Sequence, residues 1–172
     1  MVSERKSVRP LLAITMGDPS GIGPEIVLKA LAQPGLYERC RPLVVGDREI
    51  LQRAMAWPGV PELSITGVDK RAETRYKQGQ VIFLEPLPID PGACPVGKLS
   101  VTSGRAAAAY VERACDLCMA GDAAAMVTAP LNKDALHQAG YRYAGHTELL
   151  KERTGADRVT MLLTGPTLRV VH

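Results

Sequence analysis

The chain consists of short apolar runs separated by segments in which apolar residues recur at every third or fourth position. Uninterrupted apolar runs are typical of strands covered on both faces, and the periodic segments are typical of amphipathic helices. The runs predict strands at residues 11–15, 41–46, 63–65, 81–84, 122–127, 159–163 and 168–171. The periodic segments predict helices at about residues 24–34, 47–57, 102–120 and 146–154, and a short one starting at 132–133.

Strands and helices alternate along most of the chain, which predicts an α/β fold with a largely parallel sheet and right-handed crossovers. Asp47 is expected to cap the second helix, and Thr102 or Ser103 the longest one. Two segments are expected at the surface. Residues 69–77 are charged, and residues 86–98 are rich in Pro and Gly.

Composition excludes several classes of protein. The 172 residues are 46% hydrophobic and 23% charged, enough for a domain with a real core. A net charge of +3 is too small to indicate a nucleic-acid partner. No run approaches the roughly 18 apolar residues that cross a membrane, and residues 1–6 lack the apolar core of an export signal. A cytoplasmic protein is expected, and its four cysteines suit a reducing compartment.

The chain ends inside an apolar segment, because the strand at 168–171 stops at His172 without a covering helix. An apolar strand needs a partner and a cover. We therefore expect residues 1–172 to be the front part of a longer chain.

Candidate chemistry gathers after the strand at 122–127. Asn132 and Lys133 lie in the first turn of the following helix, and His146 and Thr147 start the next one. Unpaired amides at helix starts favour anions, and ligands of open α/β sheets bind at the carboxyl ends of strands. Lys133, His146 and Thr147 are therefore predicted to converge on one small anionic substrate.

A glycine-rich segment at residues 17–25 joins the first strand to the first helix. Its glycines, at 17, 21 and 23, do not have the Gly-x-Gly-x-x-Gly spacing of dinucleotide-binding loops. A tight structural turn and a cofactor or cleft loop containing Asp18, Gly21 and Gly23 are equally favoured. Asp18 could accept a hydrogen bond from a hydroxyl or a nicotinamide amide, or it could only fix the turn.

Other reactive residues favour ordinary roles. Cys115 and Cys118 lie within a helix without a second pair at zinc-site spacing, which indicates core thiols. His137 is expected at the surface, and the three histidines are not expected to form a metal site. Ser20 lacks the Gly-x-Ser-x-Gly context of a hydrolase nucleophile. A nucleotide phosphotransferase is disfavoured because no Gly-Lys-Ser/Thr loop follows any strand.

Three separated segments, 16–25, 128–133 and 145–149, together resemble the 4-hydroxythreonine-4-phosphate dehydrogenase (PdxA) family in order and spacing. The resemblance covers essentially the whole chain but only about the first half of the family's length. A sister branch of the family acts on D-threonate or D-erythronate 4-phosphate, and the sequences at 128–137 and 145–150 look rather closer to that branch.

The resemblance implies a fold similar to isocitrate and isopropylmalate dehydrogenases, with two three-layer α/β/α domains in a homodimer. It implies oxidation of a secondary alcohol by NAD (or NADP), with decarboxylation of 4-hydroxythreonine 4-phosphate on the way to pyridoxal phosphate. A divalent metal (Zn, Mg or Co) lowers the alcohol's pKa in such chemistry, and the cofactor accepts the hydride.

The family's substrate-binding His-Thr pair falls on His146 and Thr147. Its metal-binding histidines and its phosphate-binding Lys, Asn and Arg fall beyond residue 172, so the resemblance implies no metal ligands within this chain. The 172 residues alone are then expected to be inactive. The competing interpretation is a binding or interaction module without catalysis that keeps the His146–Thr147 pocket.

Overall fold

The fold is that of a computed structural model, which describes residues 9–69 and 76–171. Most of the charged stretch predicted at the surface, residues 69–77, lies outside the described residues, as do residues 1–6 and His172. No helix among the described residues is long and apolar enough to cross a membrane.

A parallel sheet of five strands forms the centre of the described chain, in the order β3-β4-β2-β1-β5. The strands are β1 (Leu11–Thr15), β2 (Arg41–Val45), β3 (Ser64–Gly67), β4 (Gln80–Leu84) and β5 (Ala125–Thr128). Continuous apolar sequence produces the central strands, where Ala13, Val44 and Val45 are fully buried. The predicted α/β fold with a largely parallel sheet is confirmed.

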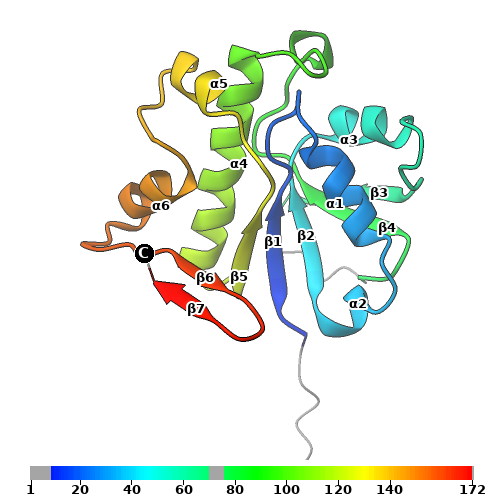
Figure 1. The fold of residues 1–172 in the computed structure, drawn as a ribbon. Coiled ribbons are helices and arrows are strands. Elements are labelled where there is room, and N and C mark those ends of the chain that lie inside the picture. The colour runs from blue at the N-terminus through cyan, green and yellow to red at the C-terminus, as the bar shows by residue number, and fades with distance from the viewer. Residues whose placement is uncertain (1–8, 70–75, 172) are drawn as a thin grey trace, which may run out of the picture.

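Helices lie to both sides of this sheet (Figure 1). They are α1 (Gly23–Leu31), α2 (Leu36–Arg39), α3 (Arg48–Met55), α4 (Val101–Met119), α5 (Lys133–Gln138) and α6 (His146–Thr154), with a 3-10 turn at Pro91–Ala93. α1 packs on α3, whereas α4 packs on β1, β2 and β5 and carries α5 and α6. The chain moves from β1 to β2 in one direction and from β4 to β5 in the other. Right-handed crossovers therefore place α1 and α4 on opposite faces.

The core has a large part and a small one. The large cluster joins the sheet to α1, α3 and α4, and includes the fully buried Tyr110 and Leu28. The small cluster, which attaches α5 and α6 to α4, contains Ala108, Val111, Leu136 and Leu149. α5 and α6 are therefore held mainly by their packing on α4.

The predicted starts of α4 and of the strand before Thr128 are wrong. Ser100, not Thr102 or Ser103, caps α4, because its hydroxyl accepts the Ser103 amide at 3.2 Å. The strand predicted as buried at 122–127 instead runs from Ala125 to Thr128, and Val127 is 49% exposed. Residues 122 and 123 follow the end of α4 rather than starting the strand, and both of their amides donate to the Leu117 carbonyl.

The last two strands form a separate antiparallel hairpin, β6 (Leu162–Thr164) with β7 (Arg169–Val171). The sequence places these strands at 159–163 and 168–171, so the structure shifts the first strand and shortens both. Every residue of the pair is exposed, and Leu168 and Val171 are 67% and 68% exposed.

Candidate active site

The carboxyl ends of β1 and β5 meet at one edge of the sheet, because the two strands are neighbours. Their following segments lead to α1 and α5, toward opposite sides of the sheet (Figure 1). Ligands of open α/β sheets bind where neighbouring connections diverge in this way. Here the diverging segments touch: the Asp18 amide donates to the Pro130 carbonyl at 2.9 Å.

Close backbone packing explains two glycines of segment 17–25. Gly17 has φ 75°, and a Cβ there would lie 2.4 Å from the Pro130 carbonyl oxygen. A Cβ on Gly23 would lie 2.1 Å from the carbonyl oxygen of Met16. At Gly21 a Cβ would have no neighbour nearer than 3.5 Å. Gly17 and Gly23 therefore have a structural reason to lack a side chain, whereas a Cβ at Gly21 would make only ordinary contacts.

Asp18 stabilises the same turn. It is 7% exposed, and its Oδ1 accepts the Ser20 amide at 2.8 Å. Burial raises the pKa of the Asp18 carboxyl, while hydrogen bonds from the Ser20 amide and Ser103 oppose this shift. Ser20 Oγ in turn lies 2.6 Å from Ser103 Oγ, and both serines are buried. Of the two roles weighed for Asp18, this geometry directly shows that it fixes the turn.

Arg53, which the sequence analysis did not single out, holds the outer side of this loop. Its Nη2 donates to the Pro19 carbonyl at 2.8 Å, and its Nη1 donates to the carbonyls of Pro91 (3.0 Å) and Cys94 (2.8 Å). One guanidinium on α3 thus joins the glycine loop to the segment before α4. An arginine in the last turn of a predicted helix is too common a feature to reveal this role.

Lys133 is the first residue of α5, and Asn132 caps that helix by accepting the Ala135 amide at 3.0 Å. The Lys133 side chain extends toward the start of α6. A Cβ built on Gly145 would lie 3.7 Å from Lys133 Cε. The structure therefore brings Lys133 beside the residue that immediately precedes His146 and Thr147.

His146 is half-buried at the start of α6, followed by the half-buried Thr147. Its Nε2 is shielded from solvent and has no hydrogen-bond partner among the described residues. Burial lowers the pKa of the imidazole below its ordinary value of 6.5. Gly145 gives α6 no side-chain cap. The site thus offers an unpaired ring nitrogen, free helix-start amides and a nearby ammonium group.

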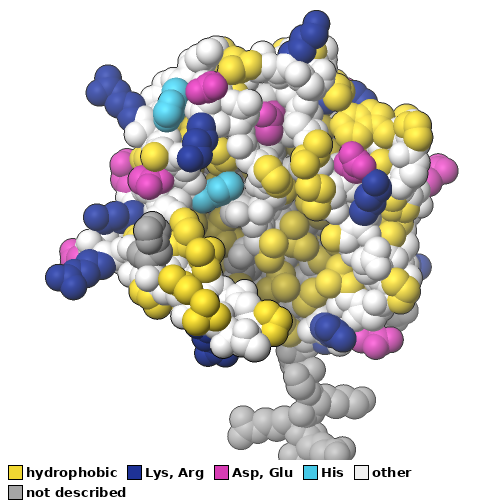
Figure 2. All heavy atoms as spheres, in the orientation of Figure 1, with side chains coloured by type: hydrophobic (Ala, Val, Ile, Leu, Met, Phe, Trp, Pro, Cys, Tyr) yellow, Lys and Arg dark blue, Asp and Glu magenta, His cyan; other side chains and the backbone are white. Residues whose placement is uncertain are grey.

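Figure 2 shows both described histidines on one face, and one of them borders a hollow with many hydrophobic side chains around it. His137 is exposed, as predicted, and its Nε2 lies 2.8 Å from the Tyr143 carbonyl oxygen. The His137 imidazole therefore makes a hydrogen bond within the protein, unlike that of His146. Buried Cys115 and half-buried Cys118 are free thiols, and burial raises the pKa of each.

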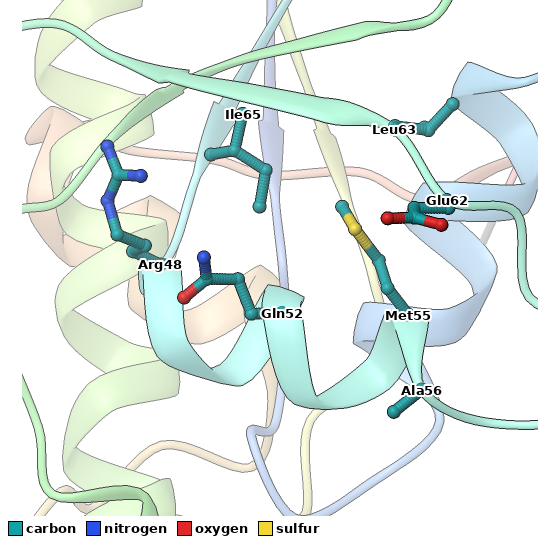
Figure 3. Close-up of a pocket in the computed structure, with 7 residues that line it drawn as sticks. All are labelled: Arg48, Gln52, Met55, Ala56, Glu62, Leu63 and Ile65. Carbon is teal, nitrogen blue, oxygen red and sulfur yellow. The ribbon is translucent and has the colours of Figure 1, made fainter.

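A groove of about 460 Å³ lies elsewhere, between α3 and the edge strand β3. Gln52 and Met55 extend from α3 toward the side on which Ile65 lies, and Arg48 extends beside them (Figure 3). The groove holds one cation, Arg48, and one carboxylate, Glu62, and it contains none of the predicted site residues. The chemistry at Lys133 and His146, rather than the size of this groove, identifies the better candidate site.

Within residues 9–69 and 76–171, no group of three or more His, Cys, Asp or Glu side chains is placed to hold a metal ion. The described part of the chain therefore offers anion-binding and hydrogen-bonding groups rather than a set of metal ligands.

Comparisons with known proteins agree on one family. Residues 38–172 match the family model described as pyridoxal phosphate biosynthetic protein PdxA. The chain is 47% identical to a 4-hydroxythreonine-4-phosphate dehydrogenase of Desulfosudis oleivorans, covering 95% of this chain and 48% of that protein. It is 43% identical to a D-threonate 4-phosphate dehydrogenase of Cupriavidus necator, again covering 95% and 48%.

The similarity is also seen in a solved structure. The crystal structure of 4-hydroxythreonine-4-phosphate dehydrogenase from Klebsiella pneumoniae superposes with a TM-score of 0.88 at 37% identity, covering 97% of this chain and 50% of that one. The chain thus spans about half the length of the relatives it matches. On the family match and these likenesses, the chain belongs to the PdxA family.

Proposed function

We propose that this chain supplies substrate-binding residues to a dehydrogenase that oxidises the secondary alcohol of a phosphorylated hydroxy acid, with a nicotinamide cofactor as hydride acceptor. The observation that carries the proposal is the buried, unpaired Nε2 of His146 at the start of α6, beside Lys133, in a member of the PdxA family. The two-domain, homodimeric arrangement implied by the resemblance is part of the proposal.

His146 is suited to hold the substrate hydroxyl. A buried polar nitrogen without a partner is costly, by about 1–3 kcal/mol, and a ligand that supplies the missing hydrogen bond recovers that energy. Because burial lowers its pKa, the imidazole is neutral near pH 7. A neutral ring can accept a proton from a hydroxyl or donate a hydrogen bond to it, depending on its tautomer. Thr147, next in the same turn, adds a hydroxyl that can donate and accept.

Lys133 is suited to hold an anionic group of the same substrate. Its ammonium is on an exposed side chain whose stem lies against Gly145, so it can reach a ligand seated at the start of α6. The uncapped amides of that helix start also favour negative charge. We assign Lys133 to the carboxylate or phosphate of the substrate, and His146 and Thr147 to its hydroxyl groups.

A nicotinamide cofactor, when bound, accepts the hydride that leaves the alcohol carbon. We propose that the loop after β1 lines the cleft in which this cofactor binds. The geometry of the loop restricts which of its atoms can contact the cofactor. Asp18 is buried and already accepts a hydrogen bond from Ser20, so its carboxyl orients the loop. A Cβ at Gly21 would make only ordinary contacts, with Asp18, so we propose the backbone at Gly21 as the contact with the cofactor. We propose NAD, with NADP as the alternative.

The described residues do not form a metal site, so a divalent metal such as Zn, Mg or Co would be held by other residues. What these residues do is bind and orient: Lys133 fixes an anionic end, and His146 fixes the hydroxyl.

For the substrate, we propose 4-phosphooxy-L-threonine, whose oxidation gives a β-keto acid that loses carbon dioxide. The second candidate is D-threonate or D-erythronate 4-phosphate, because relatives of similar identity are named for D-threonate 4-phosphate. The two classes differ at the carbon next to the carboxylate, which carries an amino group in one and a hydroxyl in the other.

The test is NADH formation by protein expressed from the complete native gene, with each phosphorylated acid in turn and with divalent metal added. Turnover of 4-phosphooxy-L-threonine supports the main proposal, and turnover of D-threonate 4-phosphate alone supports the second. Binding of either compound without any NADH would indicate the catalytically inactive binding module instead. Sedimentation of the same sample tests the proposed homodimer.

A further inference from the structure

The first turn of α4 contacts both segments that follow β1 and β5. Ser103 Oγ lies 2.6 Å from Ser20 Oγ in the loop after β1. The next residue, Gly104, faces α5: a Cβ there would lie 2.1 Å from the carbonyl oxygen of Ala135 and 2.3 Å from its carbonyl carbon. Two consecutive residues therefore connect the glycine loop to the helix that begins with Lys133.

The Gly104 contact cannot be relieved by rotating a side chain, because every near neighbour is a backbone atom of α5. The third neighbour, at 2.8 Å, is the amide nitrogen of Leu136. A methyl group at position 104 would force α4 and α5 apart by roughly 1 Å, given ordinary contact distances. Lys133 lies in the same first turn of α5 as Ala135 and would move with it.

Ser103 makes the second connection, toward the glycine loop. The side chain is fully buried and is not used for capping, since Ser100 caps the helix by accepting the Ser103 amide. Its hydroxyl is therefore available to Ser20, and it also stabilises the charged form of Asp18. Removing this oxygen leaves a buried hydroxyl on Ser20 without that partner.

We propose that Ser103 and Gly104 are positioning residues, which hold the glycine loop and α5 at a fixed separation and so determine how tightly the phosphorylated substrate binds at Lys133 and His146. Neither residue is assigned a contact with the substrate. The inference rests on the proposed function, because it takes Lys133 and His146 as substrate-binding residues.

The central variant is Gly104→Ala, and Gly165→Ala is its matched control. Gly165 lies in the turn between β6 and β7, and a Cβ there would have its nearest neighbour at an ordinary 3.6 Å. By helix propensity alone, Ala at position 104 would stabilise α4 by up to about 1 kcal/mol. Despite this gain in helix stability, we expect the variant to bind the substrate less well. Gly104→Ala lowers kcat/KM for the substrate by on the order of 100-fold, mostly through KM, as expected for misplacement by about 1 Å.

Ser103→Ala adds no bulk, so it tests the proposal even if the Gly104→Ala protein does not fold. It should raise the substrate KM by about two- to tenfold, the loss of one hydrogen bond, with a smaller change in kcat. Gly165→Ala should keep wild-type constants. A folded Gly104→Ala protein and a Ser103→Ala protein that both keep the wild-type KM would overturn the proposal.

A second measurement does not require activity. Backbone amide chemical shifts of residues 133–138 and 145–147 should change in Gly104→Ala and stay unchanged in Gly165→Ala. If the wild-type protein forms no NADH, the proposed function fails, while these shifts still decide whether α4 positions α5. Unchanged shifts in residues 133–138 would contradict the positioning role directly.

Discussion

Lys133 extends its side chain over Gly145, so that a Cβ at Gly145 would lie 3.7 Å from Lys133 Cε. These residues are separated by a helix and a turn, yet the packing of α5 and α6 on α4 brings them together. The contact places an ammonium group beside the start of α6, where His146 has an unpaired ring nitrogen. A cation and a neutral hydrogen-bonding ring at one helix start make up the proposed site for a hydroxylated anion.

Replacing Lys133 tests the anion-binding half of this site. Lys133→Ala should raise the substrate KM by about tenfold or more, because a charge-assisted hydrogen bond contributes about 1.5–3 kcal/mol. Lys29→Ala is the control, since Lys29 is an exposed lysine on α1 whose ion pair with Glu25 contributes little. Steady-state kinetics on both variants gives the comparison. Equal KM values would remove Lys133 from the substrate site.

Burial of His146 makes stability depend on pH in a defined direction. Its pKa is lowered in the folded protein, so between 6.5 and that lower value the unfolded chain binds more protons. Stability is therefore fully present above pH 6.5 and declines as pH falls toward the folded-state pKa. In thermal melts, His146→Gln should lack this part of the decline, whereas His137→Gln, at an exposed histidine, should retain it. Identical pH profiles for wild type and His146→Gln would contradict the buried, neutral imidazole.

The glycine loop should be intolerant of side chains at particular positions only. Gly23→Ala is expected to destabilise the fold by about 1–3 kcal/mol through overpacking, because its Cβ would lie 2.1 Å from the Met16 carbonyl oxygen. Gly21→Ala should change the free energy of unfolding much less, since its Cβ meets only ordinary contacts. Urea denaturation of the two variants measures the difference. Comparable losses at both positions would show that backbone packing does not account for Gly23.

Arg53 should contribute more to stability than its position near the end of α3 indicates. Arg53→Met keeps the apolar stem but removes the donors to the carbonyls of Pro19, Pro91 and Cys94. The expected loss is about 2–4 kcal/mol, mainly because the carbonyls of Pro19 and Cys94 lose their donor, whereas the Pro91 carbonyl still accepts the Cys94 amide. Arg158→Met, at an exposed arginine, is the control and should stay within about 0.5 kcal/mol of wild type. A similarly small loss for Arg53→Met would mean that solvent replaces these bonds.

The strands and the main helices could be predicted where one local signal dominates. Leu11–Thr15 is a continuous apolar run, and its strand has the predicted limits. Asp47 caps α3 as expected, because its carboxylate accepts the Ile50 amide at 2.9 Å. Local sequence failed at α4, where hydroxyl residues at 100, 102 and 103 compete for the cap. Ser100 also donates to the Ala93 carbonyl at 2.7 Å, a contact that only the folded chain reveals.

The residues of the candidate site could be predicted from the sequence, but the residues that hold them in position could not. Polar residues after an apolar run marked Lys133 and His146, because strand ends and helix starts have recognisable sequences. The contact between Gly104 and the Ala135 backbone joins residues far apart in the sequence, and a single glycine within a helical pattern does not reveal its partner. The same holds for Arg53, whose three acceptors are backbone atoms and leave no pattern in side-chain types.

The most direct test of the proposed site compares wild type with His146→Gln in NADH formation from 4-phosphooxy-L-threonine, using protein from the complete native gene with divalent metal present. The account predicts turnover by wild type and a fall in kcat/KM of about tenfold or more in the variant, the loss of one hydrogen bond to the reacting hydroxyl. Folding of the variant is checked by its thermal melt at pH 7.5. Wild-type kinetics in a folded His146→Gln protein would contradict the assignment of His146 to the substrate.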